Sequence, residues 1–186
     1  MISVDDIILP DTEDTSCGIT THLINQDINF DNRVSIFSAV ILDNNVSKYK
    51  KLQMDDLKRI DELIIEHHKL VLEIDVAGHF DHTFTLYNTT NGIYIVDSYL
   101  YQKKLEKRPF DLNKLYQMLI DVDAYINKYE QCECIDGITK TKKYYNGTSI
   151  VTFNECAKIW NNFWDVTDIS GASGNLDYYT IKCYHS

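Results

Sequence analysis

The stretch HTFTLYNTTNGIYIVD, residues 82–97, decides the fold of this chain. Two runs of alternating apolar and polar residues flank a turn rich in Asn, Thr and Gly, and this pattern predicts a β-hairpin. Phe84 and Leu86 share one face of the first strand, because side chains alternate along a strand. Ile93 and Ile95 share one face of the second strand for the same reason. A histidine opens the first strand and an aspartate closes the second.

Two registers of this hairpin fit the sequence, and they differ in the distance between His82 and Asp97. A loop centred on residues 88–91 pairs apolar with apolar residues and places His82 opposite Asp97, with Cβ atoms about 5 Å apart. A tight turn at residues 91–92 would instead place Leu86 opposite Asp97 and move His82 several residues away. We favour the first register, because it leaves the two polar residues together at the open end of the hairpin.

Length and composition predict an ordinary globular protein. The chain has 186 residues, of which 44% are hydrophobic and 25% are charged. No repeat, low-complexity tract or linker-like stretch divides it, so we predict a single domain over residues 1–186.

Charge and hydropathy narrow the classes of partner and the compartment. The formal net charge of -10 argues against a nucleic-acid groove, which needs clustered cations. The N-terminus lacks the basic and apolar regions of an export signal, and no segment approaches the ~20 apolar residues of a membrane span. We therefore expect a cytoplasmic protein that binds neither nucleic acid nor membrane. Its five cysteines, an odd number, are expected to be free thiols.

The segment DTSCGITTHLINQ, residues 14–26, predicts a short helix near the N-terminus. Ser and Thr residues suited to capping precede Ile19, Leu23 and Ile24, which are spaced to share one face of a helix. Cys17 would then lie at the helix N-terminus.

Hydrophobic periodicity predicts the other elements. Apolar residues at helical spacing indicate an amphipathic helix from about Met54, and a second helix after the RPFD sequence that ends at Asp111. The apolar run at residues 34–42 fits a strand or a buried helical turn. Further strands are predicted at residues 70–76, 149–153 (SIVTF) and 178–184. An N-terminal helix carrying Cys17, followed by a mostly antiparallel sheet with packed helices, makes an α+β fold.

Cys17, His82 and Asp97 together supply the three groups of a thiol catalyst. A thiolate is stabilised by a helix N-terminus and by an imidazolium, and a third group fixes the tautomer of the imidazole. The expected roles are attack by Cys17, proton transfer by His82 and orientation of the imidazole by Asp97.

This order of residues resembles the papain-like cysteine protease superfamily in its broad sense, including its NlpC/P60 and transglutaminase-like branches. In that superfamily the catalytic Cys begins the first core helix, the His begins a strand, and an Asp, Asn or His follows on the next strand. The resemblance covers roughly residues 15–100 and implies a papain-like domain. The sequence SCGI lacks the aromatic residue that follows the papain cysteine, and no Gln upstream of Cys17 supplies the usual oxyanion donor. The backbone N–H of Cys17 remains as one donor.

Other roles for the same residues stay open on sequence alone. His79 rivals His82 as the imidazole, because HFDH at residues 79–82 places two histidines three residues apart. The same segment with Asp81 could hold a metal ion, although further ligands are missing nearby, and we expect no metal or cofactor. Asp97 could instead cap a turn at the strand end.

The leading hypothesis is a thiol hydrolase or acyltransferase that acts on an amide or thioester of a protein or peptide substrate. The alternative is a protein-interaction module without activity, because WNNFW at residues 160–164 and YLYQ at residues 99–102 could form an aromatic binding surface. The bias toward Asn, Ile, Asp, Lys and Tyr is typical of AT-rich genomes such as those of large DNA viruses, for which the compartment would be the host cytoplasm. That bias enriches tyrosine without any function. Oligomeric state is not predicted.

Overall fold

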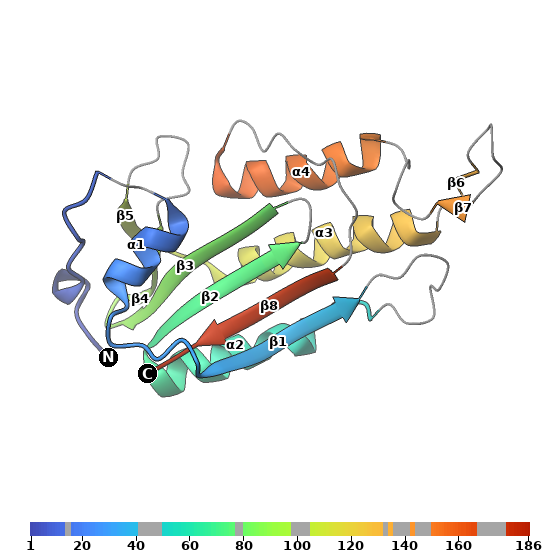
Figure 1. Ribbon diagram of the computed structural model, residues 1–186. Helices are drawn as coiled ribbons and strands as arrows, with labels where there is room; N and C mark the ends of the chain where they lie inside the picture. Colours follow the sequence, from blue (N-terminus) through green and yellow to red (C-terminus); the bar gives the residue numbers. More distant parts are fainter. Residues whose placement is uncertain are drawn as a thin grey trace.

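A computed structural model of the protein describes residues 1–13, 16–40, 50–76, 80–97, 105–131, 134–135, 142–143, 150–166 and 178–186. Six strands form one antiparallel sheet in the order β1-β8-β2-β3-β4-β5 (Figure 1). These strands are β1 (Arg33–Val40), β2 (Lys69–Val76), β3 (Phe80–Thr89), β4 (Gly92–Asp97), β5 (Glu106–Pro109) and β8 (Tyr178–Tyr184). A separate two-stranded ribbon consists of β6 (Cys134–Ile135) and β7 (Lys142–Lys143).

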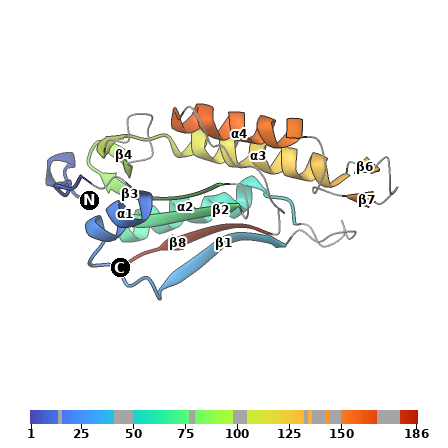
Figure 2. The same cartoon turned by 45° about the horizontal axis from the view of Figure 1, so that its top comes forward.

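Helices lie on both faces of the six-stranded sheet (Figures 1 and 2). They are α1 (Cys17–Ile24), α2 (Met54–His67), α3 (Leu112–Gln131) and α4 (Ile150–Trp164), with a short 3-10 helix at Val4–Asp6. The main core lies between the sheet and the helices α2, α3 and α4. The N-terminal segment and α1 cover part of the opposite face, where Ile7 packs on Tyr87 and Val96. The α+β prediction, with a helix carrying Cys17 near the N-terminus, is confirmed.

The hairpin of β3 and β4 forms in a register between the two that the sequence suggested. Leu86 pairs with Ile95 and Thr89 pairs with Gly92, so the turn consists of residues 90–91. Both predicted registers are therefore wrong, each by two residues. A shift of two keeps every side chain on its own face of the sheet, whereas a shift of one would reverse it.

The predicted strand SIVTF is also wrong, because residues 150–153 belong to α4. A short apolar run has no periodicity that separates a strand from a buried helix. Further along α4, Cys156, Trp160 and Trp164 are buried at helical spacing. The two tryptophans of WNNFW therefore belong to the core and do not form a binding surface. YLYQ lies outside the described residues.

Helix α1 packs on the sheet mainly through polar side chains, and of the three apolar residues that the sequence suggested only Ile24 packs against the sheet. Ile19 is 47% exposed and Leu23 is 37% exposed. Asn25, which follows α1 directly, is fully buried, and its Nδ2 donates to the Thr21 carbonyl and to Thr85 Oγ1, both at 2.7 Å. Thr21 Oγ1 donates to the Thr83 carbonyl at 3.3 Å. These bonds fix α1, and with it Cys17, against β3.

We expect Asn25→Ala to destabilise the fold and loosen α1. The substitution removes two buried hydrogen bonds and leaves Thr85 Oγ1 without its donor, which typically costs about 1–3 kcal/mol. Urea unfolding measures this loss, with Gln26→Ala as the control at the neighbouring exposed residue. Equal stability of the two variants would show that the Asn25 bonds do not hold α1.

Candidate active site

The structure brings Cys17, His82 and Asp97 together, each at the end of an element. Cys17 is the first residue of α1, His82 is the third residue of β3, and Asp97 is the last residue of β4. His22, later on α1, is exposed and its ring lies 6.2 Å from Phe30.

His82 and Asp97 form a buried hydrogen bond. The distance between His82 Nε2 and Asp97 Oδ1 is 2.8 Å, and the two residues are only 1% and 3% exposed. In the observed register Asp97 lies diagonally across from His82 and not directly opposite, but on the same face. Diagonal neighbours are within reach of long side chains. The predicted contact is therefore present although the predicted register is wrong.

Cys17 approaches His82 at an edge of β3 that β4 does not cover. Within the described residues, β4 pairs only with residues 85–89 of β3, so the strand beyond them is open on that side. Helix α1 occupies this place. Its Thr21 donates to the carbonyl of Thr83, and the backbone N–H of Thr83 donates to the sulfur of Cys17. The backbone groups that β4 leaves without a partner are thus satisfied by the helix.

The position of α1 explains how the thiol and the imidazole meet. The body of α1 lies on the face of β3 that carries Thr85, whereas the ring of His82 lies on the other face, with Phe84. The first residue of the helix lies at the open edge, where the thiol is near enough to His82 for each side chain to shift the pKa of the other. Since Nε2 of the imidazole is bonded to Asp97, Nδ1 is the ring nitrogen available to the sulfur.

Contact with His82 lowers the pKa of the Cys17 thiol below its usual value. The hydrogen bond from the imidazole is the largest cause, and the positive charge of the ring and the N–H of Thr83 act in the same direction. Partial burial and the charge of Asp81 oppose them without reversing the shift. The N-terminal end of α1 adds a favourable dipole for the thiolate.

The pKa of His82 is raised above its usual value. Burial alone would lower it, because a buried imidazolium loses its hydration. The charge and the hydrogen bond of Asp97 more than offset burial, and the thiol of Cys17 adds to their effect. The lowered thiol pKa and the raised imidazole pKa both favour a thiolate–imidazolium pair.

Aromatic residues and one cation enclose the pair of His82 and Asp97. The ring of Trp164 meets the His82 ring edge to face, with centroids 4.6 Å apart, and Phe84 stacks on it at 5.4 Å. Arg108 Nη2 lies 3.9 Å from Asp97 Oδ2. We did not anticipate Arg108 from the sequence, because its position depends on the pairing of β5 with β4, which no local pattern predicted.

The rival assignments at HFDH receive no support from the described residues. His79 lies outside them. Among the residues that the structure does describe, no group of three or more His, Cys, Asp or Glu side chains is arranged to hold a metal ion. In the same part of the chain no helix is long and apolar enough to cross a membrane.

Two further described cysteines are free thiols in different surroundings. Cys156 and Cys183 are both buried, and burial raises the pKa of the Cys183 thiol well above its usual value. Cys17 is only partly buried. At the next residue, a Cβ added at Gly18 would meet no atom within 4 Å. Cys17 therefore combines access with a lowered pKa, as a reactive thiol requires.

The chain matches no protein-family model, no curated protein and no solved structure. Assignment of a function therefore depends on the geometry of the site itself.

We expect the Cys17 thiolate to persist to lower pH than an ordinary thiolate, because its pKa is lowered. The imidazolium of His82 persists to higher pH, because its pKa is raised, so the two shifts together favour the ion pair. The measurement is the thiolate absorbance in the ultraviolet as a function of pH, taken as the difference between the native protein and Cys17→Ser. Asp97→Asn should move the thiolate midpoint upward, since it removes the charge that supports the imidazolium.

Asp81→Asn is the control of opposite sign. The charge of Asp81 raises the thiol pKa, so its removal should leave the midpoint unchanged or move it slightly downward. A midpoint near that of a free cysteine in the native protein would contradict the ion pair.

Proposed function

We propose that the protein is a thiol enzyme that cleaves or transfers an acyl group from an amide or thioester. The single observation that carries this proposal is the convergence of Cys17, His82 and Asp97, with the thiol at a helix start and the imidazole bonded to the carboxylate. The order of these residues resembles the papain-like superfamily, and a protein or peptide substrate is the class that this resemblance implies.

In the first half-reaction the thiolate of Cys17 attacks the acyl carbon of the substrate. The carbonyl π bond opens to a tetrahedral oxyanion, which then collapses and breaks the bond to the leaving amine or thiol. His82, protonated in the ion pair, gives its proton to the leaving group. The product of this step is a thioester between the acyl group and the Cys17 sulfur.

In the second half-reaction an acceptor resolves the thioester. Neutral His82 takes a proton from water or from an acceptor amine, and the acceptor attacks the acyl carbon. The carbon–sulfur bond breaks and the Cys17 thiolate returns. Water makes the protein a peptidase or deamidase, and an amine makes it a transferase.

The N-terminus of α1 can also stabilise the negative charge of the oxyanion. Cys17 is the first residue of α1, so its backbone N–H has no acceptor within the helix and can donate to the oxyanion. Asp97 keeps the imidazole oriented with Nδ1 toward the sulfur, because Nε2 is held at 2.8 Å.

Selective alkylation tests the proposed nucleophile. At about pH 6, iodoacetamide should modify Cys17 well ahead of the buried Cys156 and Cys183, because the thiolate is the reactive form. His82→Ala should slow labelling of Cys17 by roughly tenfold or more, since each unit of thiol pKa changes the thiolate fraction tenfold. Peptide mass spectrometry with time gives the rate at each cysteine.

His22→Ala is the matched control, because His22 lies on α1 but does not contact the thiol. The rate at which Cys17 is labelled in this variant should equal the rate in the native protein. Equal labelling of all accessible cysteines, unaffected by His82→Ala, would refute the nucleophile and favour an interaction module.

Acyl transfer itself can be tested with a simple aromatic thioester and intact-protein mass spectrometry. The native protein should gain the mass of one acyl group, and Cys17→Ser should gain none. Decay of the adduct in water would identify a hydrolase, whereas decay only after addition of glycylglycine would identify a transferase. An adduct of equal yield in Cys17→Ser would contradict the proposal.

A further inference from the structure

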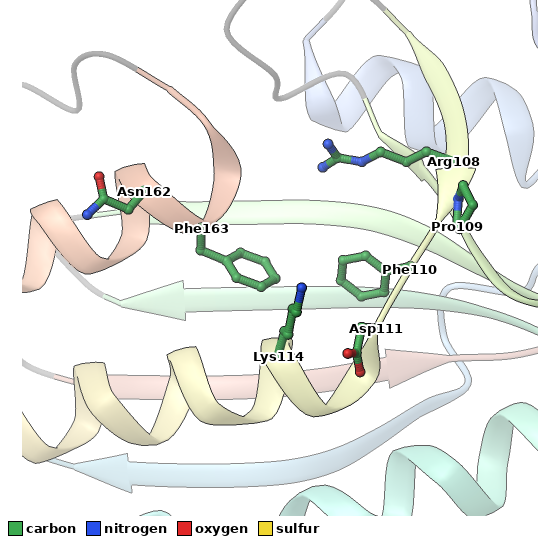
Figure 3. A pocket seen from close by; sticks show the side chains of 7 residues that line it. All are labelled: Arg108, Pro109, Phe110, Asp111, Lys114, Asn162 and Phe163. Atoms are coloured by element: carbon green, nitrogen blue, oxygen red, sulfur yellow. The ribbon is translucent and has the colours of Figure 1, made fainter.

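A hollow of about 380 Å³ opens next to Arg108, whose guanidinium lies 3.9 Å from Asp97 (Figure 3). It lies where β5, the start of α3 and the end of α4 meet. This volume is within the range of about 300–1,000 Å³ that small-molecule sites occupy. The residues that line it are Arg108, Pro109, Phe110, Asp111, Lys114, Asn162 and Phe163.

The charge of the hollow differs in sign from that of the whole chain. Arg108 and Lys114 line it in a protein whose net charge is -10. The single lining carboxylate is Asp111, whose Oδ1 accepts from the N–H of Asn113 at 2.9 Å at the start of α3, so the lining has one more cation than anion. Lys114 forms no ion pair with any residue in the described part of the chain. The amine therefore has its charge available for a ligand.

Two phenylalanine rings form the apolar wall of the hollow. Phe110 and Phe163 meet edge to face, with centroids 6.1 Å apart, and the amine of Lys114 points toward the space between them (Figure 3). Arg108 also lines the hollow, and its side chain extends from β5 above the two rings in this view, whereas the carboxylate of Asp111 points away from the rings. A ligand here would meet aromatic surface and two cations together.

The hollow is linked to the catalytic groups by two direct contacts. Arg108, which lines it, is 3.9 Å from Asp97, and only one third of its side chain is exposed (34%). On the other side, Phe163 packs on Trp164 at 4.8 Å, and Trp164 packs on His82 at 4.6 Å. A ligand that moves Arg108 or Phe163 thus acts one residue away from the imidazole and the carboxylate.

We propose that this hollow binds an oxyanion carried on an apolar or aromatic body, with Lys114 and Arg108 as its charge partners and Phe110 and Phe163 as its wall. The oxyanion is a carboxylate or a phosphate. The further assignment of this anion as part of the substrate depends on the proposed thiol chemistry, whereas its binding does not. Charge-assisted hydrogen bonds to an oxyanion are the strongest contacts that such a lining offers.

Calorimetric titration of the Cys17→Ser protein with four compounds tests the binding directly. Phenyl phosphate and phenylacetate carry an anion on a ring, benzyl alcohol carries the ring alone, and inorganic phosphate carries the charge alone. At least one of the two aromatic anions should bind roughly tenfold or more tightly than benzyl alcohol and inorganic phosphate. The tighter of the two identifies the oxyanion. Benzyl alcohol binding as well as both anions would overturn the proposal.

Lys114→Gln is the decisive variant, because Lys114 contacts neither His82 nor Asp97 in the structure. This substitution should weaken binding of the aromatic anion by about fivefold or more. Phe163→Leu should also weaken its binding, because the aromatic ring is lost. Lys58→Gln, on the exposed side of α2 and paired with Asp55, is the matched control and should have no effect. Unchanged affinity in Lys114→Gln, with an unchanged melting temperature, would refute the site.

Iodoacetamide labelling of the native protein in the presence of the tighter anion tests the assignment to the substrate. Occupation of the hollow should change the labelling rate of Cys17 and leave that of Cys183 unchanged. Binding without any change at Cys17 would overturn the assignment to the substrate. Failure of the thiol chemistry would instead appear in the anion-free protein, as equal labelling of Cys17 before and after His82→Ala.

Discussion

Two polar side chains, His82 and Asp97, are buried together on a face of the sheet whose other residues are mainly apolar. A buried carboxylate and a buried imidazole each lose hydration, and their mutual bond at 2.8 Å offsets part of that loss. The rest of the site depends on this bond. It directs one ring nitrogen to Asp97 and the other to Cys17, it raises the pKa of the imidazole, and through the imidazole it lowers the pKa of the thiol. Removal of either partner would take away the shortest polar contact of the other in the core.

The open edge of β3 is the second condition for the site. A strand edge left without a partner exposes backbone groups that attract other chains. Here α1 covers the edge, because Thr21 donates to the carbonyl of Thr83 and the N–H of Thr83 donates to the sulfur of Cys17. The same contacts hold the thiol near the imidazole. One arrangement therefore protects the strand and assembles the reactive groups. The aromatic residues behind His82 keep water from its ring, so the bond to Asp97 is formed in a medium of low polarity.

The helices and strands with a clear hydrophobic periodicity were predictable from the sequence, and so was the contact between His82 and Asp97. That contact requires the two side chains to share a face and to lie within one diagonal step, and both conditions survived an error of two residues in the favoured register. The hydrophobic face assigned to α1 was wrong for Ile19 and Leu23, because Asn25 and Thr21 make specific bonds to β3 that no apolar pattern reveals. SIVTF was misassigned because short apolar runs fit either period. Arg108 could not be found, since its contact with Asp97 depends on tertiary pairing of β5 with β4.

The order of the strands has a consequence for the timing of folding. β1 pairs only with β8 in the described sheet, and β8 separates β1 from β2 although it follows every other strand in the sequence. During synthesis β1 therefore cannot pair until residues 178–184 have been made. Closing the long loop between β1 and β8 is then slow. The hairpin of β3 and β4, by contrast, can form as soon as it leaves the ribosome. The nascent chain would pass through a period in which His82 and Asp97 are already together while one edge of the sheet is still unpaired, and in that interval aggregation competes with folding.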